Sequence, residues 1–142
     1  MRKFLLFSLM VVCALILSGM SYGQGVPDRD YTIAVTLLNE DEYEAAESKF
    51  SLIIQKGDLS NPKAVPYIVN SYYGRASSRI EQGRKFRLDK KLKEATDKYN
   101  QAYDDLFTFK NKFEELQDTL KTNPSLYEEM DNNFKRQNSG YC

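Results

Sequence analysis

Residues 88–121 read LDKKLKEATDKYNQAYDDLFTFKNKFEELQDTLK, and this stretch has the most regular apolar pattern of the chain outside its N-terminal apolar run. It contains no glycine or proline, and its apolar residues recur at alternating spacings of four and three. That is the heptad period of a helix with one buried face, so the stretch predicts a single helix about 50 Å long. One heptad column holds Leu92, Tyr99, Leu106, Phe113 and Leu120, and the other holds Ala95, Ala102, Phe109 and Leu116.

Shorter helical patterns lie on both sides of this stretch. Gly57, Pro62, Gly83 and Pro124 are stop or turn signals that separate apolar residues recurring at helical spacing. Short connections between the helices favour antiparallel neighbours, so we expect an all-α fold of antiparallel helix hairpins. The predicted helices span residues 29–39, 41–56, 63–82, 88–121 and 125–136, within one domain of residues 29–137.

The N-terminus has the three parts of a secretory signal peptide. Arg2 and Lys3 are basic, residues 4–17 are uncharged and almost wholly apolar, and Ser21 and Gly23 place small residues before a cut at Gln24. We expect residues 1–23 to be removed and residues 24–28 to form a linker, which gives an exported protein, periplasmic or secreted. The alternative is an uncleaved anchor, and we expect membrane contact only in that case.

The chain has two cysteines, Cys13 and Cys142. Cys13 leaves with the signal peptide, so the mature chain has a single thiol and no internal disulfide. Cys142 either links two chains or is inconsequential at the end of the polar tail, residues 138–142, whose composition predicts flexibility.

Composition argues against catalysis. The chain has 20 basic and 20 acidic residues and no histidine, so it lacks the commonest general base and metal ligand and has no general attraction to nucleic acid. It has no glycine-rich phosphate loop, nucleophile elbow or calcium loop. The pairs Glu114-Glu115 and Glu128-Glu129 are adjacent on helices, where neighbouring side chains point about 100° apart. We expect no catalytic residue, no cofactor, no metal site and no nucleic-acid partner.

Small residues at set positions of the helix pairs resemble the tetratricopeptide repeat, whose helix hairpins pack through alanines. Residues 42–50, EYEAAESKF, and residues 92–102, LKEATDKYNQA, are similar to its second helix, and residues 73–76, YGRA, resemble its first. The resemblance covers two degenerate repeats, from Arg29 to about Tyr103. Its repeat-packing positions fall on Ala46, Phe50, Gly74, Ala95, Tyr99 and Ala102. Ala46 and Ala95 are 49 residues apart, whereas the family's period is 34, so we expect the second repeat to have an elongated first helix or an inserted basic loop.

In that family the first helices line a concave groove that holds an extended peptide. Arg75 and Arg79 are one helical turn apart and are able to hold a carboxylate together. The other reading is that both are surface arginines whose stems cover the helix beneath. The resemblance implies a peptide groove at Tyr31, Val35, Leu38, Ser71, Arg75, Ser78 and Arg79.

The second half of the heptad stripe has two readings. The first two helices, or a last helix that folds back with Tyr127, Met130 and Phe134, can cover it. Without such cover it forms an exposed strip for a homodimer or another partner, at Phe109, Phe113, Leu116 and Leu120.

Residues 84–93 are strongly basic, with Asp89 as the one acidic residue. They form either a solvated connecting loop or a surface that binds anionic polymer, lipid or an acidic partner. The basic patch consists of Arg84, Lys85, Arg87, Lys90, Lys91 and Lys93.

Three functions follow as expectations. The first is a non-enzymatic adaptor that resembles the tetratricopeptide family and binds another protein or peptide in the bacterial cell envelope. The second is a structural assembly protein that self-associates through the long helix, with or without a Cys142 disulfide. The third is a binder of anionic polymer or lipid through residues 84–93.

Overall fold

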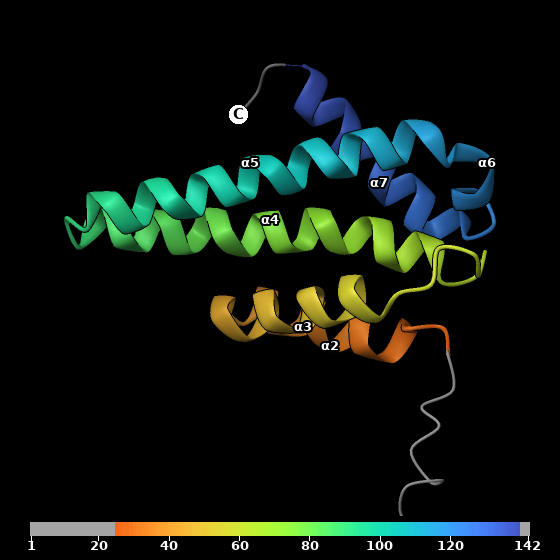
Figure 1. The fold of residues 1–142 in the computed structure, drawn as a ribbon, viewed down its shortest axis with the longest axis horizontal. Coiled ribbons are helices and arrows are strands. Elements are labelled where there is room, and N and C mark those ends of the chain that lie inside the picture. Colours follow the sequence, from red (N-terminus) through yellow and green to blue (C-terminus); the bar gives the residue numbers. More distant parts are fainter. Residues whose placement is uncertain (1–24, 140–142) are drawn as a thin grey trace, which may run out of the picture.

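The computed structural model describes residues 25–139. The predicted signal peptide of residues 1–23 and the cysteines Cys13 and Cys142 lie outside the described residues. Within residues 25–139 every regular element is a helix, and the first four helices pack as antiparallel neighbours (Figure 1), so the all-α prediction is confirmed. The helices are α2 (Asp28–Asn39), α3 (Tyr43–Lys56), α4 (Val65–Leu88), α5 (Leu92–Glu115), α6 (Gln117–Leu120) and α7 (Pro124–Asn138).

Helix α4 is the centre of the fold, because it packs against α3 on one side and α5 on the other (Figure 1). A glycine marks each of these contacts. A Cβ on Gly74 would overlap the ring of Phe50 from α3, and a Cβ on Gly83 would lie 2.7 Å from Cε1 of Tyr99 from α5. Phe50 and Tyr99 are 49 residues apart, the same separation as Ala46 and Ala95. The 49-residue spacing therefore relates two aromatic residues, Phe50 and Tyr99, that each pack against a glycine of α4.

The α2–α3 and α4–α5 hairpins turn in the same way. Asp41 and Lys90, again 49 residues apart, have the left-handed φ values of 63° and 60°. The next amide in each turn reaches back five residues, from Glu42 to the Leu37 carbonyl and from Lys91 to the Phe86 carbonyl, at 2.9 Å in both cases. This is the Schellman closure of a helix C-terminus, and it keeps both reversals short.

The ends of α4 and α5 differ from the predicted ones. Gly83 does not end α4, which continues to Leu88, because this glycine makes room for Tyr99 rather than for a turn. Most of the predicted basic loop is thus helical, and only Asp89–Lys91 connects α4 to α5. The predicted helix 88–121 is also interrupted: α5 ends at Glu115, and Leu116 (φ −108°, ψ 17°) leads into the short α6. The bend lets Leu120 enter the core.

The apolar interior forms two clusters that share the N-terminal half of α4. The first joins α2, α3 and α4 around Tyr31, Phe50 and Ile68, and the second joins α4 to α5, α6 and α7 around Phe109 and Phe113. In the second cluster the Phe113 ring lies 4.8 Å from that of Phe134 on α7, centroid to centroid. None of the helices in the described part of the chain is both long and apolar enough to cross a membrane.

Candidate functional site

The residues of the predicted peptide groove lie mostly inside the molecule. Ser71 and Ser78 are fully buried, and their hydroxyls donate to the carbonyls of Tyr67 and Gly74 on their own helix, at 2.6 and 3.0 Å. Val35 and Leu38 are half-buried and pack against the first cluster. These side chains are thus directed into the core of the hairpin pair, which corrects the expectation that they line a groove.

Tyr31 is the third apolar residue of that expected groove, and it too is buried. Its ring packs edge-on against Phe50 and Tyr67, with centroids 6.1 and 5.5 Å away. The Asn70 amide donates to its hydroxyl at 2.5 Å and to Glu129 Oε1 of α7 at 3.0 Å. Burial raises the pKa of Tyr31, and the charge of Glu129 acts in the same direction. Asn70 therefore ties α2 to α7 across α4.

Arg75 and Arg79 do share a carboxylate, and it belongs to Asp105 of the same chain. Arg75 donates to both oxygens of Asp105, from Nη2 at 2.6 Å and Nε at 3.0 Å, and Arg79 Nη1 donates to Oδ2 at 2.7 Å. The Asp105 side chain is only 5% exposed. The two arginines are therefore occupied within the fold, and the carboxylate-binding geometry serves the α4–α5 contact.

Glu47 of α3 extends this network to a third helix. Its carboxylate accepts from Arg79 Nε at 2.8 Å, Lys98 Nζ at 2.7 Å and Gln82 Nε2 at 2.6 Å. Burial alone would raise the pKa of Glu47, but the hydrogen bonds from Lys98, Arg79 and Gln82 outweigh it and lower the pKa to about 2. We call this set of groups the ion network: Glu47, Arg75, Arg79, Gln82, Lys98 and Asp105.

The expected self-association strip is covered by the chain itself. Phe109, Phe113 and Leu120 are at most 1% exposed, and Leu116 is half-buried. Tyr127 and Phe134 of α7 contact the Phe113 ring, with centroids 5.7 and 4.8 Å away. Of the two readings left open by the sequence, the folded-back last helix is the one observed.

The basic patch surrounds the free end of the α4–α5 hairpin, and every one of its side chains is exposed. Arg84 pairs with Glu81 at 2.7 Å, and the Lys91 ammonium lies 5.9 Å from the centre of the Phe86 ring. Two leucines lie among these cations, Leu88 with 79% and Leu92 with 66% of its surface exposed. The heptad pattern had placed both on a buried face.

A pair of exposed aromatic residues on α5 had no signal in the heptad pattern. Tyr103 is 68% and Phe107 57% exposed, and they are four residues apart, so they form one ridge along the helix. Their positions lie outside both heptad columns, so aromatic residues there are expected to be exposed, and this is the sequence signal that could have identified them. We call Tyr103 and Phe107 the aromatic ridge.

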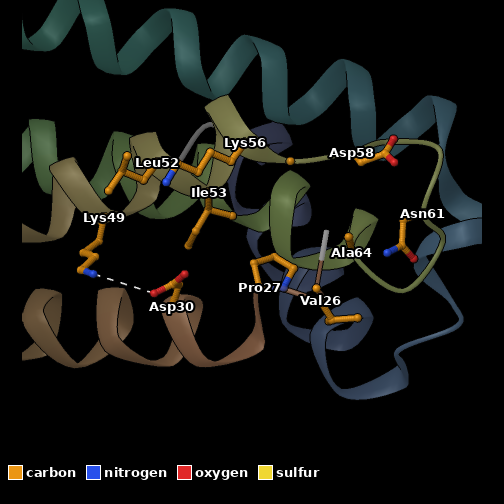
Figure 2. A pocket seen from close by; sticks show the side chains of 12 residues that line it. Val26, Pro27, Asp30, Lys49, Leu52, Ile53, Lys56, Asp58, Asn61 and Ala64 are labelled. Carbon is orange, nitrogen blue, oxygen red and sulfur yellow. Dashed lines mark ion pairs between the residues drawn. The ribbon is translucent and has the colours of Figure 1, made fainter. Parts of the chain in front are cut away.

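A shallow hollow of about 590 Å³ lies beside the start of α2. Figure 2 shows Val26 and Pro27 on one side of it and Leu52 and Ile53 of α3 on another, and the Asp30–Lys49 ion pair also lines it. That pair is long, 3.8 Å, and solvent-exposed. Across residues 25–139 no group of histidine, cysteine, aspartate and glutamate side chains is arranged to hold a metal ion.

The repeat-packing residues occupy the helix contacts already described. Ala46, Phe50, Ala95 and Ala102 are buried, as is Gly74, and Tyr99 is half-buried against Gly83. Searches against protein-family models, curated proteins and solved structures found no match to this chain. The resemblance to the tetratricopeptide repeat thus remains a prediction from the sequence.

Proposed function

We propose that this chain is a non-enzymatic, exported adaptor of tetratricopeptide type that binds another protein or peptide in the bacterial cell envelope. The observation that carries the proposal is the aromatic ridge, two large exposed side chains one turn apart on the 24-residue helix α5. Aromatic side chains supply much of the binding energy of protein interfaces because they bury a large area at low entropic cost.

The ion network supports a non-enzymatic role. A catalytic carboxylate needs access to a substrate proton or a reacting atom, whereas those of Glu47 and Asp105 are held by arginine and lysine donors of the same chain. Since Arg75 and Arg79 are engaged in this way, we place the partner on the outer face of α5 rather than in a groove between the first helices of each pair.

Affinity capture from envelope extracts tests this proposal. The exported protein and its Tyr103→Ala/Phe107→Ala variant are immobilised, and the captured proteins are identified by mass spectrometry. We expect the aromatic variant to lose the captured partner, because the substitutions remove the aromatic area that the partner would bury. The variant should remain folded, because more than half of the surface of each residue is exposed and the core is left intact. The matched control is Leu52→Ala/Leu59→Ala, which removes two other exposed apolar side chains. Equal capture by the wild type and the aromatic variant would rule the ridge out.

The assembly function has lost its predicted surface, because the strip of Phe109, Phe113, Leu116 and Leu120 packs beneath α6 and α7. A second copy of the chain would have to bind another exposed apolar surface, such as the aromatic ridge. Light scattering over a range of protein concentrations decides between the two: a wild-type dimer that the ridge variant turns into a monomer would replace the adaptor proposal with self-assembly.

A further inference from the structure

The free end of the α4–α5 hairpin projects beyond the other helices (Figure 1). Tyr43, the first residue of α3, lies beside Gln82, whose side-chain amide donates to the Tyr43 carbonyl at 3.5 Å. The residues of α4 beyond Gln82, and those of α5 that face them, therefore extend past the end of α3. We call residues 84–93 the hairpin tip.

The hairpin tip is positively charged. It carries six basic side chains and one acidic side chain, Asp89, and the next residue, Glu94, is also acidic. Arg84 is the basic residue with a carboxylate partner, Glu81. Within residues 25–139 no carboxylate forms an ion pair with the other five. A cluster of this kind attracts an anionic surface, and each basic residue near such a surface contributes roughly a fivefold factor to binding.

The hairpin tip is also apolar at its end. Leu88 is the last residue of α4 and Leu92 the first of α5, and they are the two most exposed leucines in the described part of the chain. The left-handed Lys90 keeps the connection between them to three residues, so both leucines lie at the same end of the hairpin. Exposing these two leucines to water is unfavourable. A surface that bound its partner through charge alone would have no need of exposed leucines.

The combination favours one kind of partner. A soluble anionic polymer or a uniformly acidic peptide would be attracted by the cations but would leave the leucines in water. At a lipid interface the apolar side chains enter the boundary between headgroups and acyl chains, while lysine and arginine reach the phosphates with their long stems. We propose that the hairpin tip binds the surface of an anionic lipid bilayer, with Leu88 and Leu92 inserted and the surrounding basic side chains contacting the lipid phosphates.

This contact differs from an N-terminal anchor, because it is reversible, sensitive to salt and made by the folded domain. It is also independent of the adaptor function, which uses the aromatic ridge of α5. If both hold, the hairpin tip places the adaptor at a membrane surface while the ridge stays available to a protein partner.

Vesicle flotation tests the proposal. The protein is purified after export, its N-terminus is determined by mass spectrometry, and it is mixed with vesicles of phosphatidylcholine alone or with about 30% phosphatidylglycerol. We expect binding to the anionic vesicles only, and release when salt is raised from about 50 to about 500 mM, since screening shortens the reach of the charges. Failure to bind anionic vesicles at low salt would overturn the proposal.

Two tip variants separate charge from insertion. Lys85→Gln/Lys90→Gln/Lys91→Gln/Lys93→Gln is expected to weaken binding more than about a hundredfold, because four cations are removed. Leu88→Ser/Leu92→Ser keeps all charges and is expected to weaken binding about tenfold or more, because the inserted apolar area is lost. Circular dichroism confirms that each variant is folded.

The matched controls change the same residue types elsewhere on the surface. Arg29→Gln/Lys63→Gln/Arg136→Gln replaces exposed cations away from the hairpin tip, and Leu52→Ser/Leu59→Ser replaces exposed leucines. Both controls should bind as the wild type does. If the Leu88→Ser/Leu92→Ser variant also binds as the wild type does, and soluble polyglutamate displaces both from the vesicles equally, the hairpin tip is an acidic-polymer site and the lipid proposal fails.

Discussion

Arg75 and Asp105 form a two-point ion pair across the contact between α4 and α5, with both oxygens of the carboxylate within 3.0 Å of the guanidinium. Planar guanidinium and carboxylate groups match in this geometry, which makes it the strongest form of side-chain ion pair. Arg79 adds a third donor to the same carboxylate and passes the network on to Glu47 of α3. The buried charges thus join three helices at one place.

Removal of the central carboxylate should be costly. Asp105→Ala leaves Arg75 and Arg79 largely buried without their shared partner, and we expect the free energy of unfolding to fall by about 3 kcal/mol. Urea denaturation measures the change. Asp104→Ala is the matched control, since the neighbouring side chain is exposed, and it should stay within about 0.5 kcal/mol of the wild type. Equal losses for the two variants would show that the network contributes nothing specific.

Acid should weaken the fold through Glu47. Its pKa is about 2 in the folded state against an ordinary value of 4.5, so the folded state holds the carboxylate ionised while the unfolded chain takes up a proton. The contribution of Glu47 is therefore complete above about pH 4.5 and is lost as the pH falls from there towards 2. The free energies of unfolding of the wild type and Glu47→Gln should differ clearly at neutral pH and converge in acid. The exposed control Glu114→Gln should show no such convergence.

The two contact glycines of α4 should respond differently to an added methyl group. Gly74→Ala forces a Cβ into the fully buried Phe50 ring, and we expect it to destabilise the fold by about 1–3 kcal/mol, even though alanine is the better helix former by about 1 kcal/mol. Gly83→Ala should cost less, because Tyr99 is only half-buried and its ring is able to shift. Thermal or urea unfolding compares them.

A second substitution checks the cause of the Gly74 effect. In the Phe50→Leu background, where the ring is gone, Gly74→Ala should cost less than in the wild type, which a double-mutant cycle measures. An unchanged cost would mean that the methyl group clashes with something other than Phe50.

The sequence predicts the helices well because their periodicity is a local property, but it does not say what each feature contacts. The spacing of Arg75 and Arg79 indicates a shared carboxylate, yet Asp105 is 30 and 26 residues away along the chain, so only the packing of α5 on α4 identifies it as the partner. Gly83 has the same ambiguity. A glycine that ends a helix and one that admits a neighbouring ring both act by lacking a Cβ, and the sequence does not distinguish them.

Exposure is harder still to predict. Leu88 and Leu92 continue the apolar spacing of the heptad stripe, but α3 has 14 residues and α4 and α5 have 24 each. Because α3 is shorter and begins beside Gln82, it does not reach the hairpin tip and leaves it uncovered. The strip of Phe109 and Phe113 shows the opposite case, because α7 returns to cover it.

The order of helix packing has a consequence for how the chain folds. The main contacts are between helices that follow one another along the chain, α2 with α3, α3 with α4 and α4 with α5. Turns closed by Asp41 and Lys90 bring the partners of two of these pairs together over a few residues. Little loop-closure entropy is then lost before native contacts form, which is typical of helical proteins that fold in microseconds to milliseconds. We expect the docking of α7 to be the slower step, since α7 packs against α4, from which it is separated along the chain by α5 and α6.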